Sequence, residues 1–156
     1  MIGFGYDVHR LASGESLVLG GVTLESKLGT VAHSDGDVLL HAIMDALLGA
    51  LALGDIGLHF PDTSAEWRGA DSIALLKHVH QLIRNEGAHI VNIDSTVVLE
   101  APRLRPHIDA MRTRIAGALA LDIKRVSIKA TTNERLGFIG REEGVAAYAV
   151  VQVEGD

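Results

Sequence analysis

The chain has 156 residues, a net charge of −6 and no cysteine. This length suits one domain with its own core, and the missing cysteines exclude disulfides, thiolate metal ligands and cysteine nucleophiles. The negative charge argues against a general nucleic-acid surface, which would carry the opposite sign. Apolar residues make up 47% of the chain and the mean hydropathy is +0.24, so we expect some apolar surface to be buried between subunits.

No apolar run is long enough to cross a bilayer, because charged residues or glycines interrupt each one. The first ten residues, MIGFGYDVHR, resemble the opening of a strand and not a basic segment followed by an apolar signal core. We therefore expect a cytoplasmic protein.

In the first half of the chain, residues 2–8 are predicted to form a strand. Residues 16–24 (SLVLGGVTL) are predicted to form a bent or hairpin partner with Gly20 and Gly21 at the bend. A polar loop follows, and then a helix over residues 37–51. That helix is apolar on nearly every side, which is typical of a buried helix.

The second half begins with a long connection over residues 53–70, and loops of that length are often functional. A helix over 72–86 has Asp71 as its expected N-cap, and Pro106 suits the first turn of a third helix. The remaining strands are predicted at 89–99, 125–131 and 145–153, the last two joined by a Gly-rich loop over 133–144. This order predicts a single α+β domain over residues 1–156, with a mixed β-sheet and helices packed on one face.

Asp7 and His9 lie two residues apart on the first predicted strand, so their side chains leave the same face. A carboxylate beside an imidazole can form half of a zinc site. An exposed polar strand end would give the same short pattern.

The apolar helix over 37–51 carries a polar stripe of Asp37, His41 and Asp45 at spacings of four. Buried ionisable groups need partners, so the stripe is expected to face a cavity, a metal or an interface. We favour His41 as the third ligand over a hydrogen-bonded core histidine, because two imidazoles and one carboxylate leave a fourth tetrahedral position open, as catalytic zinc requires. Asp37 or Asp45 would then accept hydrogen bonds from the ligand imidazoles.

Two further segments carry groups suited to phosphate. His33 and Ser34 precede the buried helix, whose N-terminus offers free N–H groups to an anion, although Ser34 or Asp35 could equally act as an ordinary cap. The segment 129–134 (KATTNE) ends a strand with hydroxyl and N–H donors, and Glu134 suits a hard cation such as Mg²⁺. Plain β-propensity of the two threonines is the alternative.

Several stretches along the whole chain carry a family resemblance: GYDVHRL, LGG, AHSDGDVLLHAIMDALLGALALGDIGLHFPD, GADS, EAPRLRPHI and IKATTNERLGFIGREEG. The chain resembles the 2-C-methyl-D-erythritol 2,4-cyclodiphosphate synthase family of the non-mevalonate isoprenoid pathway. The resemblance implies an α+β homotrimer with active sites at the subunit interfaces. It implies that the 2-phosphate of 4-diphosphocytidyl-2-C-methyl-D-erythritol 2-phosphate attacks the β-phosphorus, giving a cyclic diphosphate and CMP.

The resemblance also implies roles for individual residues. Zn²⁺ or another divalent transition metal would bind Asp7, His9 and His41, and His33 and Thr132 would steady the transition state. Mg²⁺ or Mn²⁺ would bind Glu134 together with the substrate diphosphate. The implied substrate contacts are Asp7, His9, His33, Ser34, Asp55, Ile56, Gly57, Phe60, Pro61, Asp62, Thr63, Ser64, Leu99, Glu100, Ala101, Pro102, Arg103, Leu104, Arg105, Thr131, Thr132, Asn133, Glu134, Phe138 and Arg141.

The sequence departs from the family pattern at four positions, Ser64, Arg103, Asn133 and Ile139, none of which is an implied metal ligand. Two other functions stay open. A zinc-dependent phosphoester hydrolase would use the same ligands with water as the nucleophile. A non-catalytic trimer that binds nucleotide or metal would show no turnover. Neither nucleic acid nor membrane is expected as a partner.

Overall fold

The computed structural model describes residues 1–155. A five-stranded sheet has the strand order β4-β1-β7-β5-β6, and β2 and β3 form a separate hairpin. The strands are β1 (Ile2–Ser13), β2 (Leu17–Leu19), β3 (Val22–Leu24), β4 (Leu28–Thr30), β5 (Ala88–Val98), β6 (Val126–Thr131) and β7 (Gly144–Gly155). β5 and β6 are parallel while the other neighbours are antiparallel, so the predicted mixed α+β sheet is confirmed.

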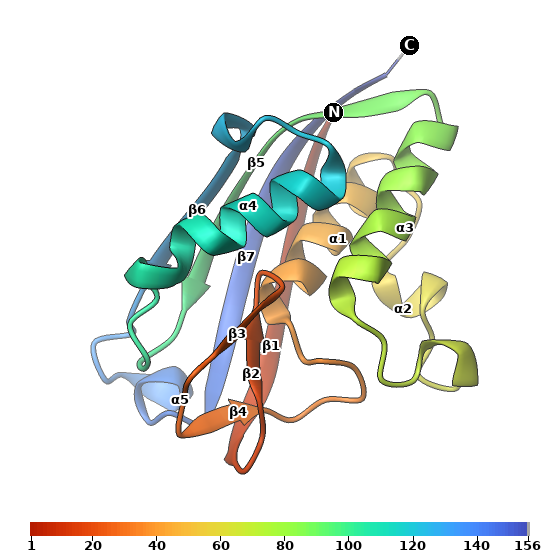
Figure 1. Ribbon diagram of the computed structural model, residues 1–156. Coiled ribbons are helices and arrows are strands. Elements are labelled where there is room, and N and C mark those ends of the chain that lie inside the picture. The colour runs from red at the N-terminus through yellow and green to blue at the C-terminus, as the bar shows by residue number, and fades with distance from the viewer. Residues whose placement is uncertain (156) are drawn as a thin grey trace.

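Three helices cover one face of this sheet (Figure 1). They are α1 (Val38–Ala50), α3 (Ser72–Asn85) and α4 (Ile108–Leu119). The short helices α2 (Ile56–His59) and α5 (Gly137–Gly140) and three 3₁₀ turns, Ala65–Trp67, Arg105–His107 and Ile123–Arg125, lie in the connections. The α4 crossover is what allows β5 and β6 to run parallel, because parallel neighbours cannot be joined by a tight hairpin. The prediction of helices on one face is confirmed.

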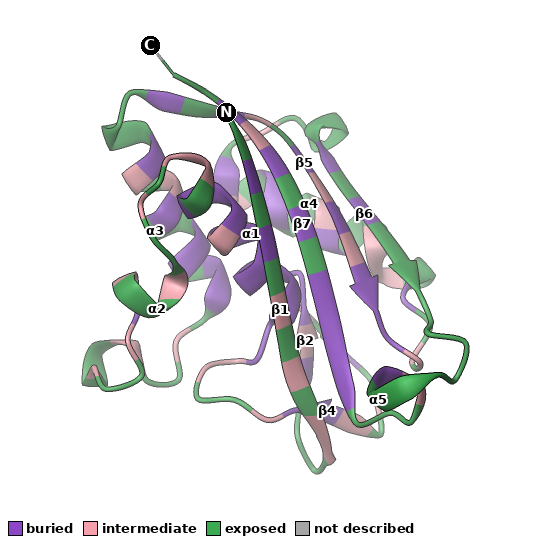
Figure 2. Cartoon of the chain, turned by 180° about the vertical axis from the view of Figure 1, so that it is seen from behind, coloured by how far each residue is buried: buried purple, intermediate pink, exposed green. Residues whose placement is uncertain are grey.

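The two faces of β1 differ sharply because successive side chains point to opposite sides of a strand. Gly3 and Gly5 are buried beneath the helices and Asp7 is partly buried, whereas Phe4 and Tyr6 are exposed on the other face. Figure 2 shows this uncovered face of the sheet with alternating buried and exposed positions along the strands.

Close contact between α1 and β1 depends on glycine. A Cβ on Gly5 would overlap the carbonyl oxygen of Ala42, and one on Gly3 would overlap that of Ala46. With only hydrogen at these two strand positions, the α1 backbone lies directly against β1. This contact brings the middle of α1, including His41, toward the middle of β1.

Some element boundaries differ from the predictions. β1 continues to Ser13 because its polar end pairs with β4, which the prediction assigned to loop. The connection over 53–70 contains α2, and the predicted Gly-rich loop contains α5. Pro106 lies in a 3₁₀ turn, and the α-helix begins only at Ile108. Within residues 1–155, no helix has the length and apolar character needed to cross a membrane.

Candidate active site

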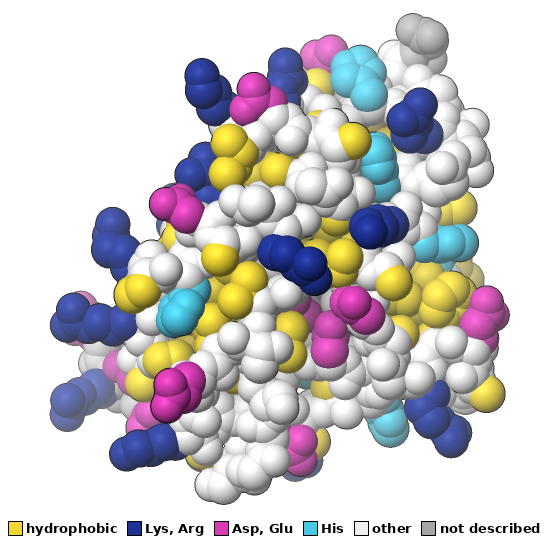
Figure 3. Space-filling model, viewed as in Figure 1, with side chains coloured by type: hydrophobic (Ala, Val, Ile, Leu, Met, Phe, Trp, Pro, Cys, Tyr) yellow, Lys and Arg dark blue, Asp and Glu magenta, His cyan; other side chains and the backbone are white. Residues whose placement is uncertain are grey.

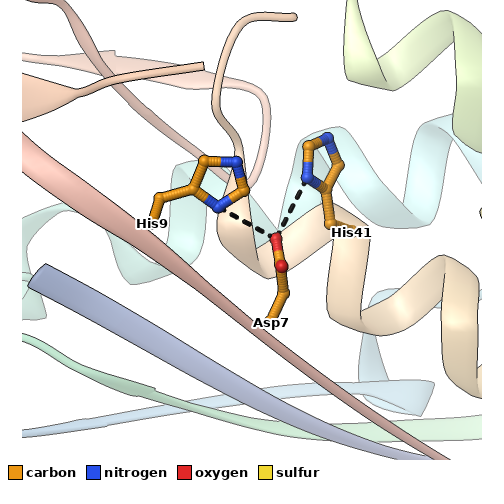
Figure 4. A group of neighbouring side chains, drawn as sticks. All are labelled: Asp7, His9 and His41. Carbon is orange, nitrogen blue, oxygen red and sulfur yellow. Dashed lines mark hydrogen bonds and ion pairs between the residues drawn. The ribbon is translucent and has the colours of Figure 1, made fainter. Parts of the chain in front are cut away.

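Asp7, His9 and His41 form one cluster (Figure 4). The Oδ2 atom of Asp7 lies 3.0 Å from His9 Nδ1 and 3.1 Å from His41 Nδ1. All three potential ligand atoms lie within 4.8 Å of one another. Two of these side chains come from alternate positions of β1 and the third from α1, so the predicted convergence of the three residues is confirmed.

The cluster is electrostatically coupled. Burial raises the pKa of the Asp7 carboxyl, but the neighbouring imidazoles of His41 and His9 outweigh this effect and lower the pKa to about 2. Burial lowers the pKa of His41, and the hydrogen bond and charge of Asp7 outweigh that effect and leave it raised. The carboxylate is therefore ionised at neutral pH and faces two nitrogen ligands.

These residues fit a divalent metal ion. His9 Nδ1 is buried and makes no hydrogen bond, and it lies 3.0 Å from Asp7 Oδ2 as an ion-pair contact. A buried nitrogen lone pair without a donor is the arrangement expected of a metal ligand. Ligands about 2 Å from a tetrahedral ion lie roughly 3.3 Å apart, close to the two distances from Asp7. The donor set is consistent with a divalent metal.

The groups that contact His41 on its far side differ from the prediction. Asp37 is fully buried and accepts N–H groups of Gly20, Gly21 and Leu40, and burial raises its pKa to about 6. Asp45 accepts the N–H of Ile56.

Both carboxylates are used by backbone donors, so the prediction that one of them accepts from a ligand imidazole is wrong. The hydroxyl oxygens of Ser72 and Ser34 instead lie 3.2 and 3.4 Å from His41 Nε2. Nothing in the spacing of the sequence pointed to Ser72, which is the first residue of α3.

A cavity of about 620 Å³ opens beside the cluster. The residues of its lining that the sequence predicted are Asp7, His9, His33, Ser34, His41, Ile56, Gly57, Phe60, Pro61, Asp62 and Ser64. The lining also contains six residues that the sequence did not single out: Val31, Ala32, Met44, Trp67, Arg68 and Leu75. Arg68 adds a cation to the lining of this cavity. Asp55 and Thr63 are outside the lining, and the Asp55 carboxylate caps α2 by accepting the N–H of Leu58.

A second cavity, of about 700 Å³, lies where β5 and β6 end beside the start of α4. It is lined by Leu99, Glu100, Pro102, Arg103, Leu104, Arg105, Ile108, Asp109, Ile128, Lys129, Ala130, Thr131 and Thr132. Lys and Arg side chains gather along the left edge of the molecule, on the side of β6 (Figure 3). The carboxylate of Glu100 accepts N–H groups of Asn133 and Arg135 and so shapes the loop after β6.

Besides Asp55 and Thr63, five predicted residues line neither cavity: Ala101, Asn133, Glu134, Phe138 and Arg141. Glu134 is exposed in a left-handed turn (φ 53°), and the Arg141 guanidinium pairs with Glu143 at 2.9 Å. His33 and Thr132 line different cavities of one chain. A single chain therefore separates the two residues that the resemblance assigns to the transition state.

The fold and the site together describe a class of protein: a single α+β domain with a candidate metal site, made of one carboxylate and two imidazoles, in a cavity beside the sheet. The sequence profile of the YgbB family matches residues 1–154, and the chain belongs to this family. A curated relative from Symbiobacterium thermophilum, named 2-C-methyl-D-erythritol 2,4-cyclodiphosphate synthase, is 59% identical over 99% of this chain and 99% of its own. The family resemblance predicted from the sequence is confirmed.

Solved structures agree with this assignment. A structure of 2C-methyl-D-erythritol-2,4-cyclodiphosphate synthase in a form bound to CDP superposes with a TM-score of 0.92 at 39% identity, over 99% of this chain and 100% of that one. The bifunctional IspDF from Campylobacter jejuni gives a TM-score of 0.95 at 44% identity, and here the chain covers 42% of the larger protein.

Proposed function

We propose that this protein converts 4-diphosphocytidyl-2-C-methyl-D-erythritol 2-phosphate to 2-C-methyl-D-erythritol 2,4-cyclodiphosphate and CMP. The observation that carries the proposal is the Asp7, His9 and His41 cluster inside a cavity, in a chain whose near-full-length relatives bear the name of this synthase. In the reaction an oxygen of the 2-phosphate bonds to the β-phosphorus. The bond from that phosphorus to the bridging oxygen breaks, and CMP leaves with the electron pair, as a phosphorus–oxygen lyase requires.

The first cavity would hold the diphosphate. Zn²⁺ or another divalent transition metal, held by Asp7, His9 and His41, supplies Lewis-acid chemistry at a phosphate oxygen when bound. His33 and Ser34 lie on the same cavity wall and offer hydrogen-bond donors, and Arg68 offers positive charge. The protein's main task is to fold one flexible anion into an in-line geometry, because nucleophile and electrophile belong to the same molecule.

The second cavity would hold the cytidine nucleotide. Arg103, Arg105 and Lys129 line it and offset the overall negative charge of the chain. Glu134 follows the lining residue Thr132 by two positions and is an exposed carboxylate. It is suited to hold Mg²⁺ or Mn²⁺ together with the substrate phosphates. Thr132, at the end of the strand, would contact the reacting phosphates.

A homotrimer would join the two cavities of neighbouring chains into one active site. Two observations support it. His33 and Thr132 line separate cavities in one chain, and the helix-free face of the sheet exposes Phe4 at 62% and Tyr6 at 43%. Apolar side chains gathered on a sheet face are typical of a subunit interface. The cytoplasmic location inferred from the sequence stays a prediction.

The test is product analysis. Purified protein is incubated with the cytidyl substrate and Mg²⁺, and phosphorus-containing products are identified by ³¹P NMR. We expect a cyclic diphosphate and CMP, lost on addition of a strong chelator and restored by Zn²⁺. A linear phosphate product would indicate the hydrolase instead, and binding without turnover would indicate the non-catalytic trimer.

His41→Ala provides the matched variant. Removal of one of three ligands should lower kcat by at least about 100-fold, since the Lewis acid contributes several kcal/mol to the transition state. Circular dichroism and gel filtration should match those of the wild type. A His41→Ala protein that binds zinc normally would contradict the ligand assignment.

A further inference from the structure

We propose that Ser72 and Asp35 are positioning residues for the metal ligand His41, forming a carboxylate–hydroxyl–imidazole chain that fixes which ring nitrogen is free for the metal. This inference rests on the metal site of the proposed function and deepens it. The contacts that form the chain lie behind the ligand, on the side away from Asp7. They join three segments: the loop before α1, α1 itself, and the first turn of α3.

The hydroxyl of Ser72 is at the centre of this arrangement. It is completely buried, and its oxygen lies 3.2 Å from His41 Nε2. The same hydroxyl donates to Asp35 Oδ1 at 2.5 Å, a length typical of a hydroxyl that donates to an ionised carboxylate. Asp35 Oδ2 accepts the backbone N–H of Ser72 at 2.8 Å, so both carboxylate oxygens bind Ser72, and Oδ1 also accepts the N–H of Asp37.

Counting protons assigns the tautomer of His41. A serine hydroxyl has a single hydrogen, and here that hydrogen points to Asp35. The contact between Ser72 and the imidazole must therefore use the serine oxygen as the acceptor and Nε2–H as the donor. With a proton fixed on Nε2, the neutral ring presents the lone pair of Nδ1, the atom that faces Asp7, to a metal ion.

The other nearby groups do not compete for this role. Ser34 is 3.4 Å from Nε2, longer than an ordinary N–H···O hydrogen bond, and its oxygen also accepts the N–H of Gly36. It is partly exposed on the cavity wall and so remains available to a substrate. Asp37 and Asp45, which the sequence suggested for this position, are both bonded to backbone N–H groups.

Physical consequences follow for the metal. Partners of this kind restrain the ring, fix its tautomer and raise its basicity, and their loss typically weakens metal binding about 10- to 100-fold. Ser72→Ala removes the acceptor and leaves Nε2–H to other partners. Asp35→Asn retains the size of the side chain but offers an amide in place of one carboxylate oxygen. If that amide donates to the serine oxygen, the hydroxyl proton turns toward Nε2 and favours the wrong tautomer.

The experiment titrates Co²⁺ into chelator-stripped protein, with calorimetry for the affinity and the visible absorption bands of Co²⁺ for the ligand geometry. His41→Ala identifies the site, since it should lose one Co²⁺ per chain. Ser72→Ala and Asp35→Asn should each raise the Kd at least about 10-fold and change the band positions or intensities. The double variant should bind Co²⁺ little more weakly than whichever single variant has the larger Kd, because both residues act through one chain of contacts.

Ser95→Ala is the matched control. Ser95 is also buried, and its hydroxyl donates to the carbonyl of Ser127, far from the cluster along the chain. It should lose stability without any change in Co²⁺ affinity or spectrum. Unchanged Co²⁺ binding and spectrum in folded Ser72→Ala and Asp35→Asn would overturn the inference. If the wild type and His41→Ala bind the same amount of Co²⁺, or neither binds any, the metal site itself would be overturned.

Discussion

Asp7 is the residue on which the electrostatics of the cluster depend. It lies between two imidazoles, and one oxygen, Oδ2, faces both. Its side chain is 24% exposed, so water screens the pairing only partly. Without a bound ion, the cluster is a partly buried carboxylate paired with one or two protonatable rings, and this pairing stabilises the folded chain.

This arrangement predicts a pH dependence for the metal-free protein. The pKa of Asp7 is about 2 in the folded chain against an ordinary 3.8, so the folded state binds fewer protons than the unfolded state between these values. The stabilisation is present above about pH 4 and is lost as the pH falls toward 2. Its full size is on the order of 2 kcal/mol.

The unfolding free energy of the wild type should therefore exceed that of Asp7→Asn at pH 5.5. This difference between the two proteins should shrink by about 1 to 2 kcal/mol when the pH is lowered to 2.5. The measurement is urea unfolding in chelator at one fixed protein concentration. Asp109→Asn removes an exposed carboxylate outside the cluster and reports the general effect of losing one charge. A gap for Asp7→Asn that does not vary with pH would contradict the pairing.

The sequence predicted that Asp7, His9 and His41 would lie together, but it did not predict the groups behind His41. Asp7 and His9 share a strand face, and His41 is an ionisable residue on an apolar helix, so periodicity alone drew attention to all three. Ser72 carries no such signal, since a serine at a helix start is usually explained by capping. Its contact with His41 depends on how α3 packs against α1, which is a property of the folded chain.

Among the elements, the pair β1 and α1 determines the geometry of the site. Two residues of the cluster belong to β1 and one to α1, so the spacing between these elements sets the distance from Asp7 to His41. Gly5 faces the carbonyl of Ala42, the residue after His41, and leaves no room for a side chain. A backbone carbonyl in a helix cannot rotate away as a flexible side chain can.

Gly5→Ala should accordingly separate the two elements. We expect a loss of about 1 to 3 kcal/mol in stability, typical of an overpacked core, together with weaker Co²⁺ binding. Gly49→Ala is the control, because Gly49 is exposed on α1 with open space around its Cβ position. That variant should gain roughly 0.5 to 1 kcal/mol from helix propensity and bind Co²⁺ normally. Equal behaviour of the two variants would show that the close contact does not set the site geometry.

The sequence predicted the long elements well and the short ones poorly. α1 was predicted from its nearly continuous apolar run, and α3 from an apolar stripe that follows the capping Asp71. β4 has three residues, too few for a period of two to be visible, and its pairing with Leu11–Ser13 depends on a distant segment. α2 and α5 have four residues each, and their form is set by the loops in which they lie.

For the whole molecule, the question is what covers the helix-free face of the sheet. Tyr6 and Tyr148 are paired across β1 and β7 with ring centroids 5.1 Å apart, and Phe4 lies 6.4 Å from Tyr148. Ile2 is 67% exposed and Val150 44% exposed at the same face. Aromatic and apolar side chains in such a group favour association with other copies of the chain.

If neighbouring copies combine the two cavities, variants in different cavities should complement one another. His41→Ala disables the first cavity and Thr132→Ala the second. In an equal mixture of subunits, about one site in four pairs an intact first cavity with an intact second cavity. Selecting oligomers that carry both tags removes the homotrimers, and a mixed trimer has one such site in three. Co-expressed, differently tagged subunits purified in this way should therefore recover about a third of wild-type kcat per site, while each parent stays nearly inactive. Mixed oligomers no more active than the sum of the parents would place the whole site within a single chain, and the exposed face of the sheet would then need another explanation.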